Sequence, residues 1–211
     1  DITLSPRFFN DDKFLIQSEL RQKNKKSNHI ADFSQFVSSE KDSKGHLFYN
    51  FSKNYKSKNF NDIELDIKLE QVSDDTYLKA YKVESPIINN NSNLINSLNL
   101  NLYDESKTIN TNLNIYEDLS KTSSDRYEYV PNFSFSKIIN DNYSFRSNAY
   151  YKNYNTNITE KVLINDFEFN SNLKYLDNGL INNKKLLFKN VNSEAKNSEK
   201  FKNKNTSSLA P

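Results

Sequence analysis

Residues 63–70 alternate strictly between apolar and charged side chains, and this pattern constrains the fold more than any other feature of the chain. They read Ile63-Glu64-Leu65-Asp66-Ile67-Lys68-Leu69-Glu70. Because successive side chains of a β-strand point to opposite faces, a strand here has one apolar and one charged face. On a helix the same residues would spread around the axis without forming an apolar face. The segment therefore predicts a strand with a hydrophobic neighbour on one side and water on the other.

The same two-residue alternation recurs along most of the chain and predicts an all-β fold. We expect about eleven strands in an antiparallel up-and-down meander, since short and long connections alternate along the chain. Residues 73–75 are expected to turn between strands at 62–72 and 76–84, and residues 85–93 form a linker of turn-forming residues. The other expected strands span residues 2–9, 13–23, 30–37, 46–54, 98–103, 109–116, 126–137, 142–154 and 161–176, with one more turn and strand in 177–189.

The pattern divides the chain into a meander over residues 1–189 and a polar segment over residues 190–211. Residues 190–208 are rich in Asn, Lys and Ser, which predicts a long mobile loop. Residues 208–211 are expected to begin a further strand that is cut off. Because the chain starts on Asp1 without an initiator Met and within a strand-like pattern, we interpret it as a mature piece or fragment of a longer protein.

Composition favours a wall between lipid and water over a soluble two-layer core. Only 35% of residues are hydrophobic, yet the chain holds 13 Tyr and 15 Phe, which gather near strand ends as in the aromatic girdles of membrane barrels. No apolar run is long enough for a transmembrane helix, but barrel strands need only about 9–11 alternating residues. A half-buried strand in a soluble sandwich is the alternative reading of each strand taken singly.

Residues that could carry chemistry are few. The chain has two histidines, His29 and His46, both expected at loop edges, and it has no cysteine, so no set of convergent metal ligands is recognisable. With only two glycines it can build neither a nucleophile elbow nor a glycine-rich phosphate loop. The acidic pair Asp74-Asp75 is explained by its expected place in a turn. We therefore expect no enzyme activity and no cofactor.

Three blocks of sequence, in order, resemble a known family. Residues 1–9, DITLSPRFF, followed by residues 15–21, LIQSELR, resemble the start of the barrel in the LptD (OstA) family of lipopolysaccharide-assembly outer-membrane proteins. Residues 69–78, LEQVSDDTYL, look like the VSDxxY hairpin of that family. Residues 113–119, LNIYEDL, with residues 126–133, RYEYVPNF, are similar to its strand pair that ends in Y-x-x-x-P.

The resemblance implies a fold, a place and a function. The chain would be the N-terminal portion of a large transmembrane β-barrel, open and incomplete in this piece, in the outer membrane of a Gram-negative bacterium. That barrel inserts lipopolysaccharide into the outer leaflet. Its implied partners are lipopolysaccharide, a lipoprotein that plugs the lumen, a periplasmic lipopolysaccharide-bridge protein and outer-membrane lipids, with no nucleic acid. The family's jellyroll domain, which receives lipid from the bridge, its closing strands and the cysteines of some members are not in this chain.

Two sets of site residues follow. The resemblance places Pro6 at the seam between the first and last strands, where the family uses prolines to loosen pairing for lateral exit of the lipid. Proline has no N–H and weakens a sheet ladder, although an ordinary edge proline is the alternative. The charged face of residues 63–70 makes Glu64, Asp66, Lys68 and Glu70 the candidates to face a water-filled lumen.

Two other functions stay open. One is another outer-membrane barrel, such as a porin or receptor. The other is a soluble extracellular β-rich adhesin or structural protein, for which the chain would be a soluble monomer without detergent. Flanking sequence and genomic neighbours of the lipopolysaccharide-bridge type would separate the first reading from a porin or receptor.

Overall fold

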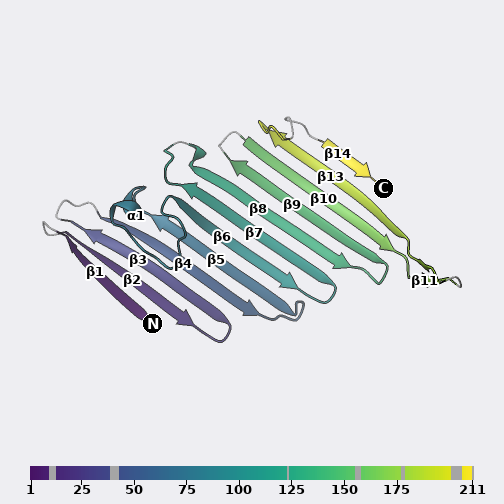
Figure 1. The fold of residues 1–211 in the computed structure, drawn as a ribbon, viewed down its shortest axis with the longest axis horizontal. Coiled ribbons are helices and arrows are strands. Elements are labelled where there is room, and N and C mark those ends of the chain that lie inside the picture. Colours follow the sequence, from purple (N-terminus) through teal and green to yellow (C-terminus); the bar gives the residue numbers. More distant parts are fainter. Residues whose placement is uncertain are drawn as a thin grey trace. The chain divides into compact units, whose positions relative to one another are not determined.

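The computed structural model describes residues 1–9, 13–38, 43–122, 124–154, 158–176, 179–200 and 206–210. Its main sheet is an antiparallel meander whose strands lie side by side in the order in which they follow one another in the sequence (Figure 1). Its twelve strands are β1 (Ile2–Phe9), β2 (Lys13–Lys23), β3 (Ser27–Val37), β4 (Lys44–Tyr55), β5 (Asp62–Val72), β6 (Asn93–Tyr103), β7 (Lys107–Asp118), β8 (Tyr127–Ile138), β9 (Tyr143–Tyr154), β10 (Ile158–Asn170), β13 (Lys185–Lys196) and β14 (Thr206–Ala210). The expected all-β antiparallel meander is thus confirmed.

The remaining elements are short. The strands β11 (Lys174–Tyr175) and β12 (Ile181–Asn182) pair with each other in a separate two-stranded sheet. A one-turn helix, α1 (Tyr77–Ala80), follows β5, and a 3₁₀ turn, η1 (Ser124–Arg126), precedes β8. Within the described residues no helix has both the length and the apolar character that a membrane crossing requires.

The chain divides into two compact units. The first unit comprises residues 1–55, 64–99 and 113–128, and the second comprises residues 56–63, 100–112 and 129–211.

Strand bounds follow backbone pairing more closely than they follow side-chain pattern. The strands expected at 2–9, 13–23 and 62–72 agree with β1, β2 and β5 residue for residue. β3 begins at Ser27 instead of residue 30, because its polar first residues pair with the end of β4, Ser27 with Lys53. Backbone hydrogen bonds form whatever the side chain, so a search for hydrophobic alternation does not detect polar residues at strand ends. The connection between the strands expected at 2–9 and 13–23, residues 10–12, lies outside the described residues.

The expected strand at 76–84 is wrong. Residues 77–80 form α1, and turns and loops connect α1 to β6. Tyr77 and Leu78 are adjacent and both fully buried, which a strand with alternating faces cannot achieve here. Tyr77 also stacks near Tyr81, four residues on, with ring centroids 5.0 Å apart. The apolar residues therefore follow the helical spacing. The segment is too short, and too interrupted by lysines, for this spacing to be recognised in the sequence.

The long loop expected over residues 190–208 is wrong in its first part. β13 runs on to Lys196, and Lys196 pairs with Thr159 of β10. The polar composition of residues 190–196 did not prevent pairing, because the ladder with β10 satisfies their backbone groups. A further strand does follow as expected, but β14 already begins at Thr206. Residues 201–205 and 211 lie outside the described residues.

In the first unit, strand register sorts side chains onto two different faces. Leu4 pairs with Ser18, Ser18 with Phe33 and Phe33 with Leu47, so these side chains share one face of β1–β4. We call this the apolar face. Eight of its large apolar side chains are 36–82% exposed: Ile2, Leu4, Phe8, Ile16, Leu20, Phe33, Val37 and Leu47.

The opposite face of β2–β4 carries the hydrophobic core. The segment between β5 and β6, residues 73–92, folds over this face, and we call it the strap. Core side chains come from the sheet and from the strap together, with two more from β6 and the end of β7: Leu15, Phe36, Phe48, Tyr77, Leu78, Val83, Ile87, Leu94 and Leu119. The strap thus provides the second layer that a single sheet lacks.

Glycine is required where the strap begins. The N–H of Gly45 donates to Ser73 Oγ at 2.8 Å, and the N–H of Ser73 donates to the carbonyl oxygen of Gly45 at 2.9 Å. A Cβ atom on Gly45 would lie 2.3 Å from the carbonyl oxygen of Ser34, closer than any side chain can approach. The absence of a side chain at residue 45 therefore lets β3, β4 and the strap meet.

In the second unit, apolar and amide side chains share a face. Phe145, Phe167 and Phe188 lie opposite one another on β9, β10 and β13. One pleat further along the same face, Ser147 Oγ donates to Asn165 Oδ1 at 2.8 Å, and Asn165 Nδ2 donates to Asn190 Oδ1 at 3.4 Å. An aromatic row and a hydrogen-bonded polar row therefore run side by side across these strands.

Candidate functional site

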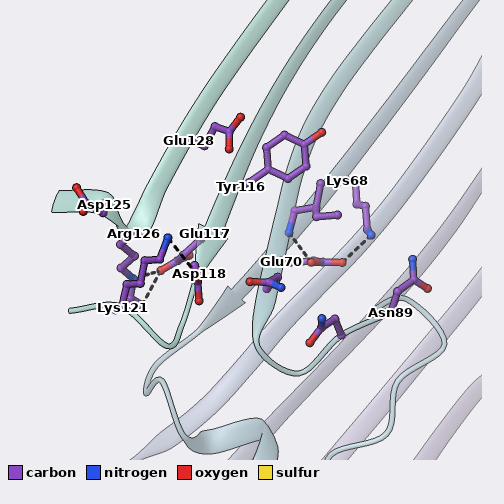
Figure 2. Close-up of a pocket in the computed structure, with 13 residues that line it drawn as sticks. Lys68, Glu70, Asn89, Tyr116, Glu117, Asp118, Lys121, Asp125, Arg126 and Glu128 are labelled. Atoms are coloured by element: carbon purple, nitrogen blue, oxygen red, sulfur yellow. Dashed lines mark hydrogen bonds and ion pairs between the residues drawn. The ribbon is translucent and has the colours of Figure 1, made fainter. Parts of the chain in front are cut away.

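A cavity of about 420 Å³ opens in the first unit between the polar side of β5, the end of the strap and the turn between β7 and β8 (Figure 2). Carboxylates outnumber cationic groups in its wall five to three, and three Asn amides and the ring of Tyr116 complete its polar lining. The lining residues are Lys68, Glu70, Asn89, Asn90, Asn93, Ile95, Tyr116, Glu117, Asp118, Lys121, Asp125, Arg126 and Glu128.

The deepest carboxylate in this wall is that of Glu70, which is 1% exposed. Lys68 Nζ lies 2.7 Å from Glu70 Oε1, and the backbone N–H of Ile95 donates to Glu70 Oε2 at 2.6 Å. Asn96 then pairs with the backbone of Glu70, accepting from its N–H at 2.8 Å and donating to its carbonyl oxygen at 3.2 Å. A buried charge is tolerated only when it is paired and hydrogen-bonded, and Glu70 meets both conditions.

Arg126 organises the other side of the cavity. Its Nη1 and Nη2 donate to the two carboxylate oxygens of Asp75 at 2.9 and 2.6 Å, and its Nε donates to Glu117 Oε1 at 2.7 Å. Tyr127 OH donates to the same Glu117 oxygen at 2.9 Å. The planar guanidinium suits this two-pronged contact. The hydrogen bonds to Asp75 and Glu117 together raise the pKa of Arg126, so the group stays charged.

The arrangement suits a ligand rich in hydroxyl groups. The cavity offers carboxylate and amide acceptors, amide and ammonium donors, and a partly exposed tyrosine ring against which an apolar sugar face can pack. The charged groups of Lys68 and Glu70, and those of Arg126 and Glu117, already form ion pairs. A neutral polar ligand can therefore bind without leaving a buried charge unpaired.

Two of the four expected lumen residues line this cavity. Lys68 and Glu70 lie in its wall (Figure 2), while Glu64 and Asp66 are not among the lining residues. Asp66 is exposed and Glu64 is partly exposed, two and four positions before Lys68 on the same face of β5. That all four face a lumen stays a prediction.

Pro6 lies in β1 at the edge of the sheet, opposite Ile16. Asp1 and Arg21 exchange both backbone hydrogen bonds, at 2.8 and 2.9 Å. Because antiparallel pairs alternate between hydrogen-bonded and non-hydrogen-bonded positions, and the register is unbroken, the Pro6–Ile16 pair is non-hydrogen-bonded. The donor that Pro6 lacks would therefore point away from β2 toward the open edge, and the β1–β2 ladder loses nothing.

A second polar cluster lies under the strap, and it corrects the expectation for the histidines. His46 lies within β4 and His29 within β3, so neither is at a loop edge. The His46 side chain has no exposed surface, because it stacks on Phe48 with ring centroids 4.3 Å apart and is covered by Tyr77. His29 is partly buried, and its Nδ1 lies 2.9 Å from Tyr49 OH.

The cluster joins an acid, a histidine and a serine. His46 Nε2 lies 3.2 Å from Asp32 Oδ1, and His46 Nδ1 lies 2.6 Å from Ser34 Oγ. Ser34 Oγ is also 2.6 Å from Tyr77 OH, and Gln17 Nε2 donates to both carboxylate oxygens of Asp32 at 3.1 Å.

These residue types form hydrolytic triads elsewhere, but here the serine hydroxyl is held between two side chains and Ser34 is only 5% exposed. The cluster therefore fastens the strap to the sheet. Sequence reasoning missed it because its members lie on different strands, and only strand register brings them together.

The described residues contain no group of three His, Cys, Asp or Glu side chains that could hold a metal ion. No protein-family model matches the chain, and no curated protein matches it at a significant level.

Proposed function

We propose that the chain is the front part of an outer-membrane β-barrel of a Gram-negative bacterium, and that this barrel inserts lipopolysaccharide into the outer leaflet. The observation that carries the proposal is the apolar face of β1–β4. Its large side chains are exposed side by side, while the opposite face is covered by the strap and holds the polar cluster. A contiguous exposed apolar surface needs a hydrophobic neighbour, and hydrocarbon on one side with water on the other is the environment of a barrel wall.

The place of Pro6 supports a weak seam at β1. An edge strand normally offers a row of free N–H and C=O groups to any strand that arrives. Pro6 removes one donor from that row and leaves the pairing with β2 intact. A strand that closes the barrel against β1 would therefore pair less firmly at Pro6, as lateral release of a lipid requires.

The cavity supports a glycolipid as the transported molecule. Its carboxylates, amides and tyrosine ring suit the sugars of lipopolysaccharide, whereas the apolar face suits its acyl chains. Partners of the proposal are lipopolysaccharide, outer-membrane lipids, a plug lipoprotein and a periplasmic bridge protein that acts through a jellyroll domain outside this chain. Neither a nucleic acid nor an enzyme activity forms part of the proposal.

Lipid contact can be tested with tryptophan, because the chain contains none. Phe33→Trp on the apolar face and Asp66→Trp on the charged face of β5 are compared in vesicles of outer-membrane lipids with brominated acyl chains. Fluorescence of the variant at residue 33 should be quenched, and that of the variant at residue 66 should not. Equal fluorescence of both variants with and without bromine, from a chain that is monomeric without detergent, would contradict the proposal and favour a soluble adhesin.

The transported molecule is tested separately in cells. A photo-cross-linking amino acid in place of Tyr116, whose ring lines the cavity, should capture lipopolysaccharide. The same substitution at Tyr175, an exposed residue of β11, should not. Pro6→Ala in the full-length protein should slow delivery of lipopolysaccharide to the cell surface. Capture at neither tyrosine, with unchanged delivery by the Pro6 variant, would leave a barrel of another kind, such as a porin or receptor.

A further inference from the structure

The strap makes a direct contact with the edge strand β1. Arg7 Nη1 donates to the carbonyl oxygens of Tyr81 and Lys82, each at 3.1 Å. Phe9, two residues on, packs edge-on against the ring of Tyr81 with centroids 5.9 Å apart. Arg7 and Phe9 share the face of β1 that lies opposite the apolar face. The strap therefore holds β1 from the polar side of the sheet.

The start of the strap is fastened to the turn between β7 and β8. Asp75 accepts two hydrogen bonds from Arg126, which also binds Glu117 at the end of β7. Lys44 Nζ lies 3.1 Å from Asp74. A cationic side chain thus holds the strap at two points, Arg126 at residue 75 and Arg7 at residues 81–82.

Around these two contacts the strap is buried and hydrogen-bonded to the sheet. Tyr77, Leu78 and Val83 are at most 2% exposed and pack in the core. Gln17 Nε2 donates to the carbonyl oxygen of Glu84 at 2.8 Å. Lys82, two residues after helix α1, has φ 46°, and the N–H of Val83 donates to the carbonyl oxygen of Leu78 at 3.0 Å. This closing turn presents the carbonyl oxygens of residues 81 and 82 to Arg7.

We propose that the strap is a brace for the edge strand: it holds β1 in the sheet through Arg7, and loosening the contact at residue 75 or the contact at residues 81–82 releases β1. An edge strand has one hydrogen-bonded neighbour, and β1 has only β2 in the strand order of the sheet. Its retention therefore depends on contacts from outside the ladder. Arg7 provides a charge-assisted contact of this kind. The buried strap connects this contact to the Asp75–Arg126 pair at the cavity.

Hydrogen exchange of the 211-residue chain in detergent micelles tests the brace. The reporters are the amides of Thr3 and Ser5, which the β1 register directs toward β2. Arg7→Gln should speed their exchange about tenfold, which corresponds to about 1.4 kcal/mol. Arg21→Gln on β2, whose exposed side chain pairs with the partly buried Glu19, is the matched control and should leave their exchange unchanged.

Asp75→Asn tests whether the contact at residue 75 also holds β1 in place. Asp118→Asn is its control, since Asp118 is also a carboxylate beside this turn, but its hydrogen bonds and ion pair go to Ser120 and Lys121. Asp75→Asn should speed exchange of Thr3 and Ser5 severalfold, while Asp118→Asn and the amides of β9–β10 should not change. If Asp75→Asn speeds exchange only within residues 73–92, or if Arg7→Gln leaves Thr3 and Ser5 at the original rate, the brace is disproved.

Discussion

The sheets of the two units sort their side chains differently. In β1–β4 one face is apolar and exposed, and the other is buried beneath the strap. In β9, β10 and β13, by contrast, each face mixes polar and apolar rows. One face has the phenylalanine row beside the Ser147–Asn165–Asn190 row, and the other has cross-strand ion pairs such as Lys185–Glu168 at 2.8 Å.

The difference teaches where each unit obtains its stability. The first unit buries large side chains between two layers, so its stability rests on core packing. In the second unit the interactions lie between side chains of neighbouring strands. Each such pair contributes roughly 0.2–1 kcal/mol. Damage to one side chain should therefore spread in the first unit and stay local in the second.

Removal of a core aromatic should give the largest effect. Phe48 is fully buried in the first unit, whereas Phe188 in the second is 42% exposed. Phe48→Ala leaves a cavity and should lower the free energy of unfolding by about 3–5 kcal/mol. Phe188→Ala should cost less than about 1 kcal/mol. Chemical denaturation followed by near-ultraviolet circular dichroism measures both, and equal losses would remove the distinction between the units.

Breaking an ion pair should come next, again with unequal results. Asp32→Asn leaves the buried His46 and Gln17 without their charged partner and should cost about 3 kcal/mol. Lys161→Ala removes a cross-strand pair with Glu194, whose two side chains are 54% and 57% exposed, and should cost less than about 1 kcal/mol. The same denaturation experiment, with 1 M salt added, should weaken the effect at Lys161 only.

Acid should loosen the start of the strap in a defined pH range. Hydrogen bonds from the side chain and backbone of Thr76, with a further one from Lys44, lower the pKa of Asp74 to about 2. A carboxylate with a lowered pKa stabilises the fold above its unfolded pKa, about 3.9, and loses that contribution as pH falls through 2. The amide resonance of Thr76, which donates to Asp74 at 2.9 Å, should titrate in this range. Asp74→Asn should abolish the titration, and a midpoint near 4 would show that these bonds are not made.

A gain in stability, the smallest effect, should come from Lys82→Gly. Lys82 has φ 46°, in the left-handed region that costs side-chain-bearing residues about 1–2 kcal/mol. Glycine adopts this conformation freely but loses more entropy on folding, so a net gain of about 0.5 kcal/mol is expected. Asn197 in the second unit, at φ 55°, is the matched site, and Asn197→Gly should gain less because asparagine tolerates this region. Thermal unfolding compares the two variants.

The period-two pattern predicted most of the sheet but only part of the site. Alternation placed Lys68 and Glu70 on one polar face, and the structure puts both in the cavity wall. It could not show that Arg126 joins Asp75 to Glu117, because those residues are distant in sequence and meet only after the strap has folded. Nor could it show that His46 is buried, since the strap that covers it was expected to be a strand.

By itself the sequence determined most of the strands, their antiparallel order and the presence of one apolar and one polar face, because a strand alternates its side chains whatever surrounds it. Tertiary structure decided which polar residues are buried, which carboxylates meet a cation, and to which side Pro6 lacks its donor. Those outcomes depend on register and on the path of residues 73–92 over the sheet, and neither is encoded in the local period of the chain.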